Sequence, residues 1–271
     1  MNQNMRWAAV LVALLLAACG GGDGDGTSAP APAPVDDSCF GPGMSEVVQG
    51  LQLRSVNTTG IQPHSCRLVG ASEGAPTEPG KRAVRISLRP GDCGGNEGYD
   101  DCANDRARFE LSETLLGPTH GQKLVRAFRV YLPTQERLRP KGGNIMFLSQ
   151  LNFGDSSSFG TLAFLEVGED GNLYVRIQKG FTWEVQNVFP AYQNPYDRWI
   201  AVRYEIDSTT APTGSFKVYV DDRLIVHETR PTVPSVQGLN YLRVGIYNAF
   251  LSQATQPYAE QVVFYDQITG R

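Results

Sequence analysis

The sequence predicts an all-β fold for most of its length, a sandwich or jelly roll made of two antiparallel sheets. Apolar and polar residues alternate with a period of two in many short segments, and Gly, Pro, Asn and Asp separate these segments. Helical periodicity is nearly absent. Ten or more short strands with turn signals between them are typical of two packed sheets.

Each expected strand places its apolar residues on one face, toward a core between the sheets. These inward positions are Val84, Ile86 and Leu88; Phe128, Val130 and Leu132; Leu173, Val175 and Ile177; Ile200, Val202, Tyr204 and Ile206; Phe216, Val218 and Val220; Val262 and Phe264. Asp221 and Asp222 predict a hairpin turn between two of the segments. The stretch from Asn144 to Asn152 is apolar on both faces until Gln150, which predicts a central strand that emerges into a groove.

Residues 1–18 predict an export signal rather than part of the fold. Arg6 precedes an apolar run from Trp7 to Leu16, which is too short to span a bilayer comfortably, and small residues follow it. The ending Leu16-Ala17-Ala18-Cys19 resembles the lipobox of bacterial lipoproteins. The resemblance implies cleavage before Cys19 and a diacylglycerol on its sulfur, and Gly20 favours the outer membrane. A plain signal peptide with a chance cysteine is the alternative.

Residues 19–38 are rich in Gly, Ala, Pro and Asp, which predicts a flexible tether. Residues 39–271 remain for one large domain, which we expect to be a monomer. It holds four cysteines, and an even number in an exported chain predicts disulfides. Of the three possible pairings, Cys39–Cys66 with Cys93–Cys102 is favoured, because the second pair brackets one loop. A structural calcium ion in the acidic loop Asp92–Asp105 is an alternative to a loop held by its disulfide alone.

The charge of the chain gives little attraction for nucleic acid, because the formal net charge is only −4. Arginine outnumbers lysine by 19 to 5. The planar guanidinium suits carboxylate and sulfate recognition better than an ammonium does. A GC-rich genome would also favour arginine, so this composition carries little weight by itself.

Three short stretches place an unusual selection of polar side chains two residues apart, where a strand points them to one face. They are Arg108 with Glu110, Gln150 with Asn152, and Arg243 and Tyr247 on either side of Gly245. Arginine, carboxamides and a tyrosine are suited to holding an acidic sugar and moving a proton. A structural salt bridge, solvent-facing strand residues and a rim aromatic are the ordinary alternatives.

Several longer runs together resemble the heparin lyase I-like polysaccharide lyases, over about residues 80–270. The runs are Gly91–Cys93 and Asp101–Glu110, Tyr196–Trp199, Gly214–Asp222, Leu242–Tyr247 and Val263–Asp266. Alginate and glucuronan lyases have related R-x-E, Q-x-H and K-x-G-x-Y-N patterns. The resemblance implies a concanavalin A-like jelly roll, an acidic polysaccharide as the partner molecule, and no required cofactor.

The resemblance also implies roles for individual residues. Tyr247 matches the catalytic tyrosine, and Arg243 matches a basic residue beside it. Gln150 matches the glutamine that faces the substrate carboxylate. Arg108 and Glu110 match the R-x-E pair.

One position departs from the family pattern, because Asn152 stands where many relatives carry a catalytic histidine. His120, in a Pro/Gly loop, is a candidate replacement for that base, although a structural role is the alternative. Asn248 follows the tyrosine, as in the family pattern, and is expected to contact the substrate.

The implied reaction is a β-elimination, in which a proton leaves the carbon that bears a uronate carboxylate. Tyr247 is the candidate for removing this proton and for donating one to the leaving oxygen. A tyrosine has a reference pKa of about 10, so it needs a nearby cation to act as a base. Arg243 is expected to favour the phenolate, and Gly245 to leave room for a sugar between them.

Two other functions stay open at this point. A non-catalytic carbohydrate-binding sandwich would explain Asn152 as a lost histidine. A glycoside hydrolase needs two carboxylates around the bond, and Glu166, Glu169 and Asp170 are the nearest candidates. Aromatic residues that could stack on sugars are Trp183, Tyr192, Tyr196 and Trp199, of which Trp199 is expected in the core.

Overall fold

The computed structural model has two large antiparallel sheets packed face to face, as predicted, and it describes residues 38–271 except 97, 115–116, 135–139, 141, 156–157 and 255–257. The expected signal, the lipidated Cys19 and the tether up to residue 37 lie outside the described residues. Regular structure in the described part consists of strands and short 3-10 turns. These turns are Pro42–Glu46, Ala71–Glu73, Cys102–Asn104 and Leu251–Gln253. No helix in this part has the length and apolarity to cross a bilayer.

The first sheet has eight strands. Its order is β15 (Arg223–Thr229), β14 (Ser215–Val220), β13 (Trp199–Asp207), β8 (Lys123–Tyr131), β17 (Gln261–Gly270), β4 (Arg82–Leu88) and β3 (Cys66–Gly70), with β1 (Val48–Gln49) parallel to β17.

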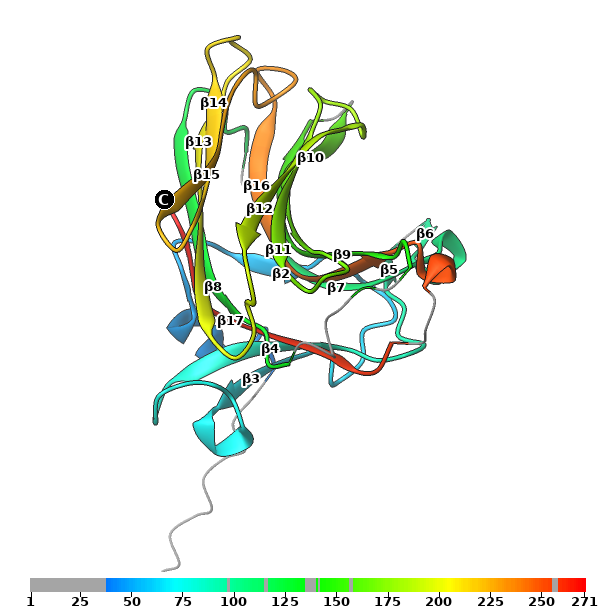
Figure 1. Cartoon of the computed structure of the whole chain (residues 1–271). Coiled ribbons are helices and arrows are strands. Elements are labelled where there is room, and N and C mark those ends of the chain that lie inside the picture. Colours follow the sequence, from blue (N-terminus) through cyan, green and yellow to red (C-terminus); the bar gives the residue numbers. More distant parts are fainter. Residues whose placement is uncertain are drawn as a thin grey trace, which may run out of the picture. The chain divides into compact units, whose positions relative to one another are not determined.

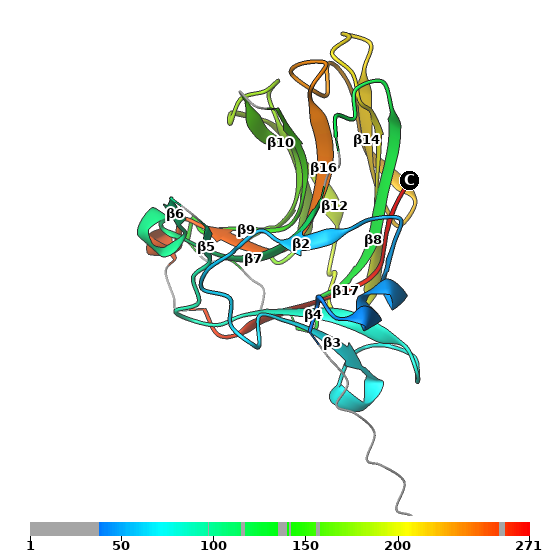
Figure 2. The same ribbon diagram turned by 180° about the vertical axis from the view of Figure 1, so that it is seen from behind.

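The second sheet has seven strands. Its order is β12 (Val185–Tyr192), β11 (Leu173–Gln178), β10 (Phe159–Val167), β9 (Ile145–Gly154), β16 (Leu239–Ala249), β7 (Arg106–Glu113) and β2 (Leu53–Ser55). Strands β9, β10 and β16 bend together, so the outer face of this sheet is concave (Figures 1 and 2). A small hairpin of β5 (Gly95–Asn96) and β6 (Tyr99–Asp100) lies at one end of that face.

The core lies between the sheets and is filled by most of the alternating positions that the sequence predicts. The inward placement of Val262 and Phe264 is wrong, because Val263 and Tyr265 are the residues of β17 that enter this core. On β8 and β13, Phe128, Val130, Val202 and Tyr204 are at most 1% exposed. Trp199 is an exception to the prediction. It is only half-buried and packs in a separate small cluster with Val262, Phe264 and neighbouring residues, while its Nε1 donates to the Pro76 carbonyl oxygen at 2.7 Å.

Two local predictions are confirmed by the structure. Asp221 and Asp222 have positive φ values of 46° and 59° and form the two-residue turn between β14 and β15, as a primed hairpin turn requires. The disulfides join Cys39 to Cys66 and Cys93 to Cys102, with Cα atoms 5.6 and 5.4 Å apart.

The central strand β9 contains an irregularity that the alternation of its residues does not reveal. Phe147 pairs with Tyr247 of β16 and Ser149 pairs with Val244, so Gly245 and Ile246 together oppose Leu148. Leu148 and Ser149 are adjacent, yet both are fully buried on the core side. On the other side of β9, Ser149 pairs with Leu165 of β10 and Phe147 pairs with the adjacent Glu166, so Leu148 is an extra residue of β9. This β-bulge moves the outward face of β9 from odd to even residues.

Two tyrosines of the opposite sheet reach across the core to this irregularity. The Tyr265 hydroxyl accepts a hydrogen bond from the Gly245 amide at 3.2 Å and donates to the Leu148 carbonyl oxygen at 2.6 Å. The Tyr204 hydroxyl bonds the Ser149 hydroxyl at 2.7 Å. Backbone groups that the ladder leaves unpaired are thus satisfied inside the core.

We expect Tyr265→Phe to lower the free energy of unfolding by about 1–3 kcal/mol, because a buried amide and carbonyl lose their partner. Tyr131→Phe is the matched control, since the one hydrogen bond of its hydroxyl among the described residues goes to Asp197 at 3.5 Å in an exposed position, and it should change stability by less than about 0.5 kcal/mol. Urea unfolding of both variants measures the difference, and equal losses would contradict the role assigned to Tyr265.

Candidate functional site

A groove of about 790 Å³ lies on the concave face of the seven-stranded sheet. Its lining brings together five residues that the sequence singles out, which are Arg108, Gln150, Asn152, Arg243 and Tyr247. Four arginines line it and none of its described lining residues is acidic. A groove with this lining is suited to an anionic ligand.

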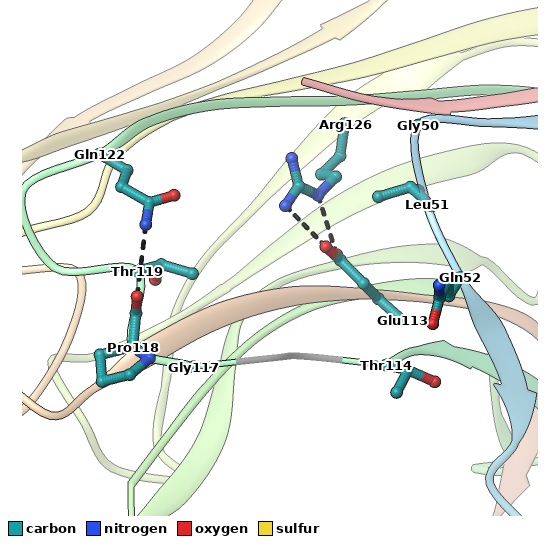
Figure 3. A pocket seen from close by; sticks show the side chains of 10 residues that line it. All are labelled: Gly50, Leu51, Gln52, Glu113, Thr114, Gly117, Pro118, Thr119, Gln122 and Arg126. Atoms are coloured by element: carbon teal, nitrogen blue, oxygen red, sulfur yellow. Dashed lines mark hydrogen bonds and ion pairs between the residues drawn. The ribbon is translucent and has the colours of Figure 1, made fainter.

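A second pocket, at one edge of the sandwich, has different chemistry (Figure 3). Its only charged lining residues, Glu113 and Arg126, are buried and bind each other through two hydrogen bonds of 2.7 and 2.8 Å. Arg126 also donates to the Arg271 carbonyl oxygen at 3.1 Å, and Glu113 accepts from the Leu242 amide at 3.2 Å. Both charged groups therefore have partners within the protein, and their ion pair links β7 of one sheet to β8 of the other.

Strand pairing explains how residues distant in sequence meet in the groove. Tyr247 on β16 pairs with Arg108 on β7, and Arg243 pairs with Gln150 on β9. Asn152 pairs with Thr161 on β10. Because neighbouring strands lie about 5 Å apart, these side chains form an array across four strands.

Tyr247 is held at one end of this array by aromatic and cationic neighbours. Its ring centroid is 5.7 Å from that of Phe147, and the Arg108 guanidinium carbon is 5.1 Å from its ring centroid. Burial raises the pKa of Tyr247 to about 12, although Arg106 and Arg108 act in the opposite direction. Its hydroxyl has no hydrogen-bond partner among the described residues and is available to a ligand.

The expected roles of Arg243 and Gly245 beside Tyr247 are wrong. Four residues along a strand span about 13 Å, which is too far for Arg243 to stabilise the phenolate strongly, and Arg106 and Arg108 are the cations that act on Tyr247. Gly245 does not open space for a sugar either. With φ at 153°, its missing side chain lets the β7 backbone approach, because a Cβ there would lie 2.2 Å from the Phe109 carbonyl oxygen.

Arg108 owes its orientation to two buried carboxylates behind it. Its Nε donates to Asp101 Oδ2 at 2.8 Å, and its Nη1 lies 3.8 Å from Glu110 Oε2. Burial alone lowers the pKa of Arg108, but Glu110 and Asp101 together raise it above its ordinary value, so the side chain stays charged. The Arg108–Glu110 contact is thus partly structural, and Glu110 lies behind the groove lining.

Sequence reasoning missed Asp101 and Tyr99, which come from the segment held by the Cys93–Cys102 disulfide. Asp101 is fully buried, and Tyr99 lines the groove with its ring centroid 5.4 Å from the Arg108 guanidinium carbon. Arg106 donates to the Tyr99 hydroxyl. Asp101 and Arg108 both lie in the run Asp101–Glu110, which is part of the family resemblance, so the sequence could have suggested Asp101 as a partner of Arg108.

The two carboxamides are oriented by neighbours that they share. Gln150 Nε2 donates to Glu110 Oε1 at 2.5 Å. Thr161 Oγ1 lies 2.7 Å from Asn152 Oδ1 and 3.3 Å from Gln150 Oε1, and donates to the nearer oxygen. Asn152 Nδ2 is buried and has no partner, which leaves an N–H donor at the groove lining. Thr161 is a further residue that sequence reasoning missed.

Arg243 lies opposite Gln150 on the neighbouring strand and has no carboxylate within ion-pair distance among the described residues. Its guanidinium carbon is 5.4 Å from the Tyr241 ring centroid, and its Nη2 donates to the Tyr241 hydroxyl at 3.4 Å. The buried Nε of Arg243 has no partner. An anionic ligand would compensate this charge.

Two expected substrate contacts lie away from the groove, and these assignments are wrong. Asn248 is fully buried, and its Nδ2 donates to Gln261 Oε1 at 2.6 Å. It follows Tyr247 on the strand and therefore points to the opposite face. His120 Nε2 lies 3.3 Å from Thr210 Oγ1 in a loop before β8, and the described lining contains no histidine.

The carboxylates proposed for a hydrolase do not flank the groove as a free pair. Arg176 binds both oxygens of Glu166, at 2.5 and 2.8 Å. Asp170 accepts hydrogen bonds from Asn172 and Tyr174, and Glu169 accepts one from the Gly143 amide. No cluster of three or more His, Cys, Asp or Glu suited to a metal ion occurs in the described part of the chain.

Comparison with known proteins adds a family and a fold. A family model described as polysaccharide lyase matches residues 74–269, whereas no curated protein matches the chain. An endo-β-1,4-glucuronan lyase from the fungus Trichoderma reesei is similar in structure, with a TM-score of 0.57, 17% identity, and coverage of 82% of this chain and 90% of that one.

Two alginate lyases share the fold. The enzyme vAL-1 from Chlorella virus has a TM-score of 0.52 and 14% identity, and the match covers 82% of this chain and 93% of that one. The enzyme AlyC3 has a TM-score of 0.53 and 14% identity, with coverage of 79% and 81%. The expected heparin lyase I-like specificity stays a prediction. With a family model that spans most of the sandwich, the chain belongs to the polysaccharide lyase family.

Proposed function

We propose that this lyase cleaves a uronate-containing polysaccharide by β-elimination, with Tyr247 as its proton-transfer residue. The observation that carries the proposal is the groove itself, which holds four arginines, four carboxamides including Gln150 and Asn152, and the free phenol of Tyr247, and has no acidic residue in its described lining. A hydrolase would need two carboxylates there. The glucuronan and alginate lyases that share the fold support a uronate polymer as the substrate class.

The reaction breaks a C–H bond at the carbon that bears the carboxylate and the C–O bond at the neighbouring carbon, and it forms a C=C bond between them. Negative charge develops on the carboxylate during proton removal. Donors that are already aimed at this group stabilise the transition state. Asn152 Nδ2, the second N–H of Gln150 and the Arg108 guanidinium are the donors that the groove offers.

Tyr247 takes the proton as phenolate and returns a proton to the leaving oxygen as phenol. Arg108 and Arg106 favour the phenolate, while burial opposes it. The resting side chain is therefore a phenol at neutral pH, and only a small ionised fraction is ready to act as the base.

The N-terminal segment supports a further proposal about location. A lipidated Cys19 would tether the domain to the bacterial outer membrane, through a lipid anchor only. Cleavage at the envelope fits a large polymeric substrate.

A second candidate function, sugar binding without cleavage, is favoured by Asn152, because the described groove lining has no histidine to serve as a separate base. Tight oligosaccharide binding with no unsaturated product would support it, and turnover gained by Asn152→His would support it further. An active wild-type chain contradicts it.

We expect the soluble domain to produce ultraviolet-absorbing unsaturated ends from at least one of alginate, glucuronan and heparin. Tyr247→Phe should reduce that rate by about 10²–10⁴-fold, because general acid–base catalysis contributes a factor of this size. Tyr131→Phe, which removes a hydroxyl outside the groove lining, is the matched control. Absence of product from every polymer contradicts the proposed function.

We expect kcat/KM to rise about tenfold per pH unit at every pH below 12 at which the protein stays folded. The reason is that kcat/KM reports ionisation of the free enzyme, and only the phenolate of Tyr247 accepts the proton. The raised pKa of about 12 places this limb on the alkaline side. Initial rates at constant ionic strength measure the slope. A flat profile would mean that Tyr247 is not the base.

Thr161→Val should lower kcat/KM by about 10–100-fold, since a misplaced group has an effect of this size, and the Asn152 amide would lose the donor that fixes it. Thr161→Ser keeps the hydroxyl and should retain most of the activity. Steady-state kinetics and a thermal melt separate the effect from unfolding, and equal activity of the two folded variants would argue against this positioning role.

A further inference from the structure

Two large aromatic side chains remain exposed at the end of the groove away from Tyr247. Trp183, in the turn between β11 and β12, is 64% exposed, and Phe159, at the start of β10, is 73% exposed. Both line the groove, and their ring centroids are 6.5 Å apart at an interplanar angle of 76°. Neither is part of the reacting centre described above. Exposed aromatic surface continuous with a groove marks a binding site.

The turn that carries Trp183 is anchored at several points. The Lys179 amide donates to the Glu184 carbonyl oxygen at 2.7 Å and closes the turn. Phe181 packs against the buried Phe153, with ring centroids 4.7 Å apart. Trp183 is therefore held outward by a defined backbone and is not a loosely placed loop residue.

An arginine from the other sheet adds to this anchoring. Arg230, which follows β15, donates to the Gly180 carbonyl oxygen at 2.5 Å and to the Gln178 carbonyl oxygen at 2.9 Å. Multiple charge-assisted hydrogen bonds reduce the freedom of the turn. A preorganised side chain loses less entropy when a ligand binds to it.

Strand register places this aromatic pair beyond the reacting sugar. Phe159 pairs with Gly154 of β9, whereas Tyr247 pairs with Phe147 of the same strand. Gly154 and Phe147 are seven positions apart, which corresponds to about 20 Å along the strand. Only a ligand several sugar units long would reach from Tyr247 to the aromatic pair.

The chemistry of this end also differs from that of the reacting end. The nearest groove arginine on the neighbouring strand, Arg176, is neutralised by its bidentate contact with Glu166. Val185 adds exposed apolar surface beside Trp183. The apolar C–H face of a sugar ring, rather than its carboxylate, is complementary to such a surface.

We propose that Trp183 and Phe159 form a distal subsite that stacks against a sugar ring of the polysaccharide, several units away from the bond that is cut. This inference rests on the proposed function for the identity of the ligand. The subsite holds long chains in the groove and contributes little to short ones. Its contribution comes from apolar contact, so it is less sensitive to salt than binding at the arginines.

Binding is measured by calorimetry in the Tyr247→Phe background, in which cleavage is slowed, with alginate, glucuronan and heparin and with their di- and trisaccharides. Trp183→Ala should weaken binding of the polymer by about tenfold, the usual scale for truncating a tryptophan contact, and leave the short oligosaccharides unchanged. Trp183→Phe should keep part of the affinity. Phe40→Ala is the matched control, because Phe40 is 52% exposed and lies outside the groove lining.

Unchanged polymer affinity in Trp183→Ala, or an equal loss for polymer and trisaccharide, would overturn the distal subsite. A change in oligomeric state measured by light scattering would also overturn it, because the aromatic pair would then be a contact between copies of the chain. If no polymer yields unsaturated product but Trp183→Ala still weakens polymer binding, the proposed function fails and the subsite stands.

Discussion

The groove depends on one irregularity in the central strand β9. Up to Phe147 the outward residues of this strand are odd-numbered, and from Gln150 they are even-numbered. Uninterrupted alternation after Phe147 would turn Gln150 and Asn152 into the core and expose Leu151. The hydroxyls of Tyr204 and Tyr265 hold the break from the opposite sheet, at Ser149 and Leu148. A hydrogen-bonded defect in the core therefore decides which side chains meet the substrate.

The electrostatics of the site depend on which charged groups face the groove and which lie behind its lining. Asp101, Glu110 and Glu166 are at most 8% exposed and lie behind the arginines that they orient. The groove presents guanidinium groups and amides, while the carboxylates are turned away from the ligand. The net charge of −4 for the whole chain conceals this separation. The guanidinium groups can therefore contact an anionic polymer directly, whereas the carboxylates behind them cannot.

The sequence was sufficient for the sheets, because side-chain alternation reports directly on burial in strands such as β8 and β13. It was also sufficient for the disulfide pairing and the Asp221–Asp222 turn, which are local features. It failed where a contact depends on register. Gly245 meets the backbone of β7 and not a sugar, and Arg108 takes the place beside Tyr247 that was expected for Arg243. Thr161 acts across a strand pair, which no spacing in one strand can reveal.

The described groove lining holds no histidine and three tyrosines. The hydroxyls of Tyr99 and Tyr241 accept hydrogen bonds from Arg106 and Arg243, so Tyr247 is the lining phenol that we propose for both proton transfers. A group with a pKa of about 12 is a strong base when ionised and is almost always present as the acid near neutral pH. A higher pKa makes the phenolate rarer near neutral pH, but it also makes each phenolate a stronger base, as Brønsted behaviour requires. Arg108 and Arg106 lower the pKa of Tyr247, which makes its phenolate less rare and correspondingly less basic. Burial and the two cations therefore act on the pKa of Tyr247 in opposite directions, and in the proposed mechanism their balance limits the rate of elimination.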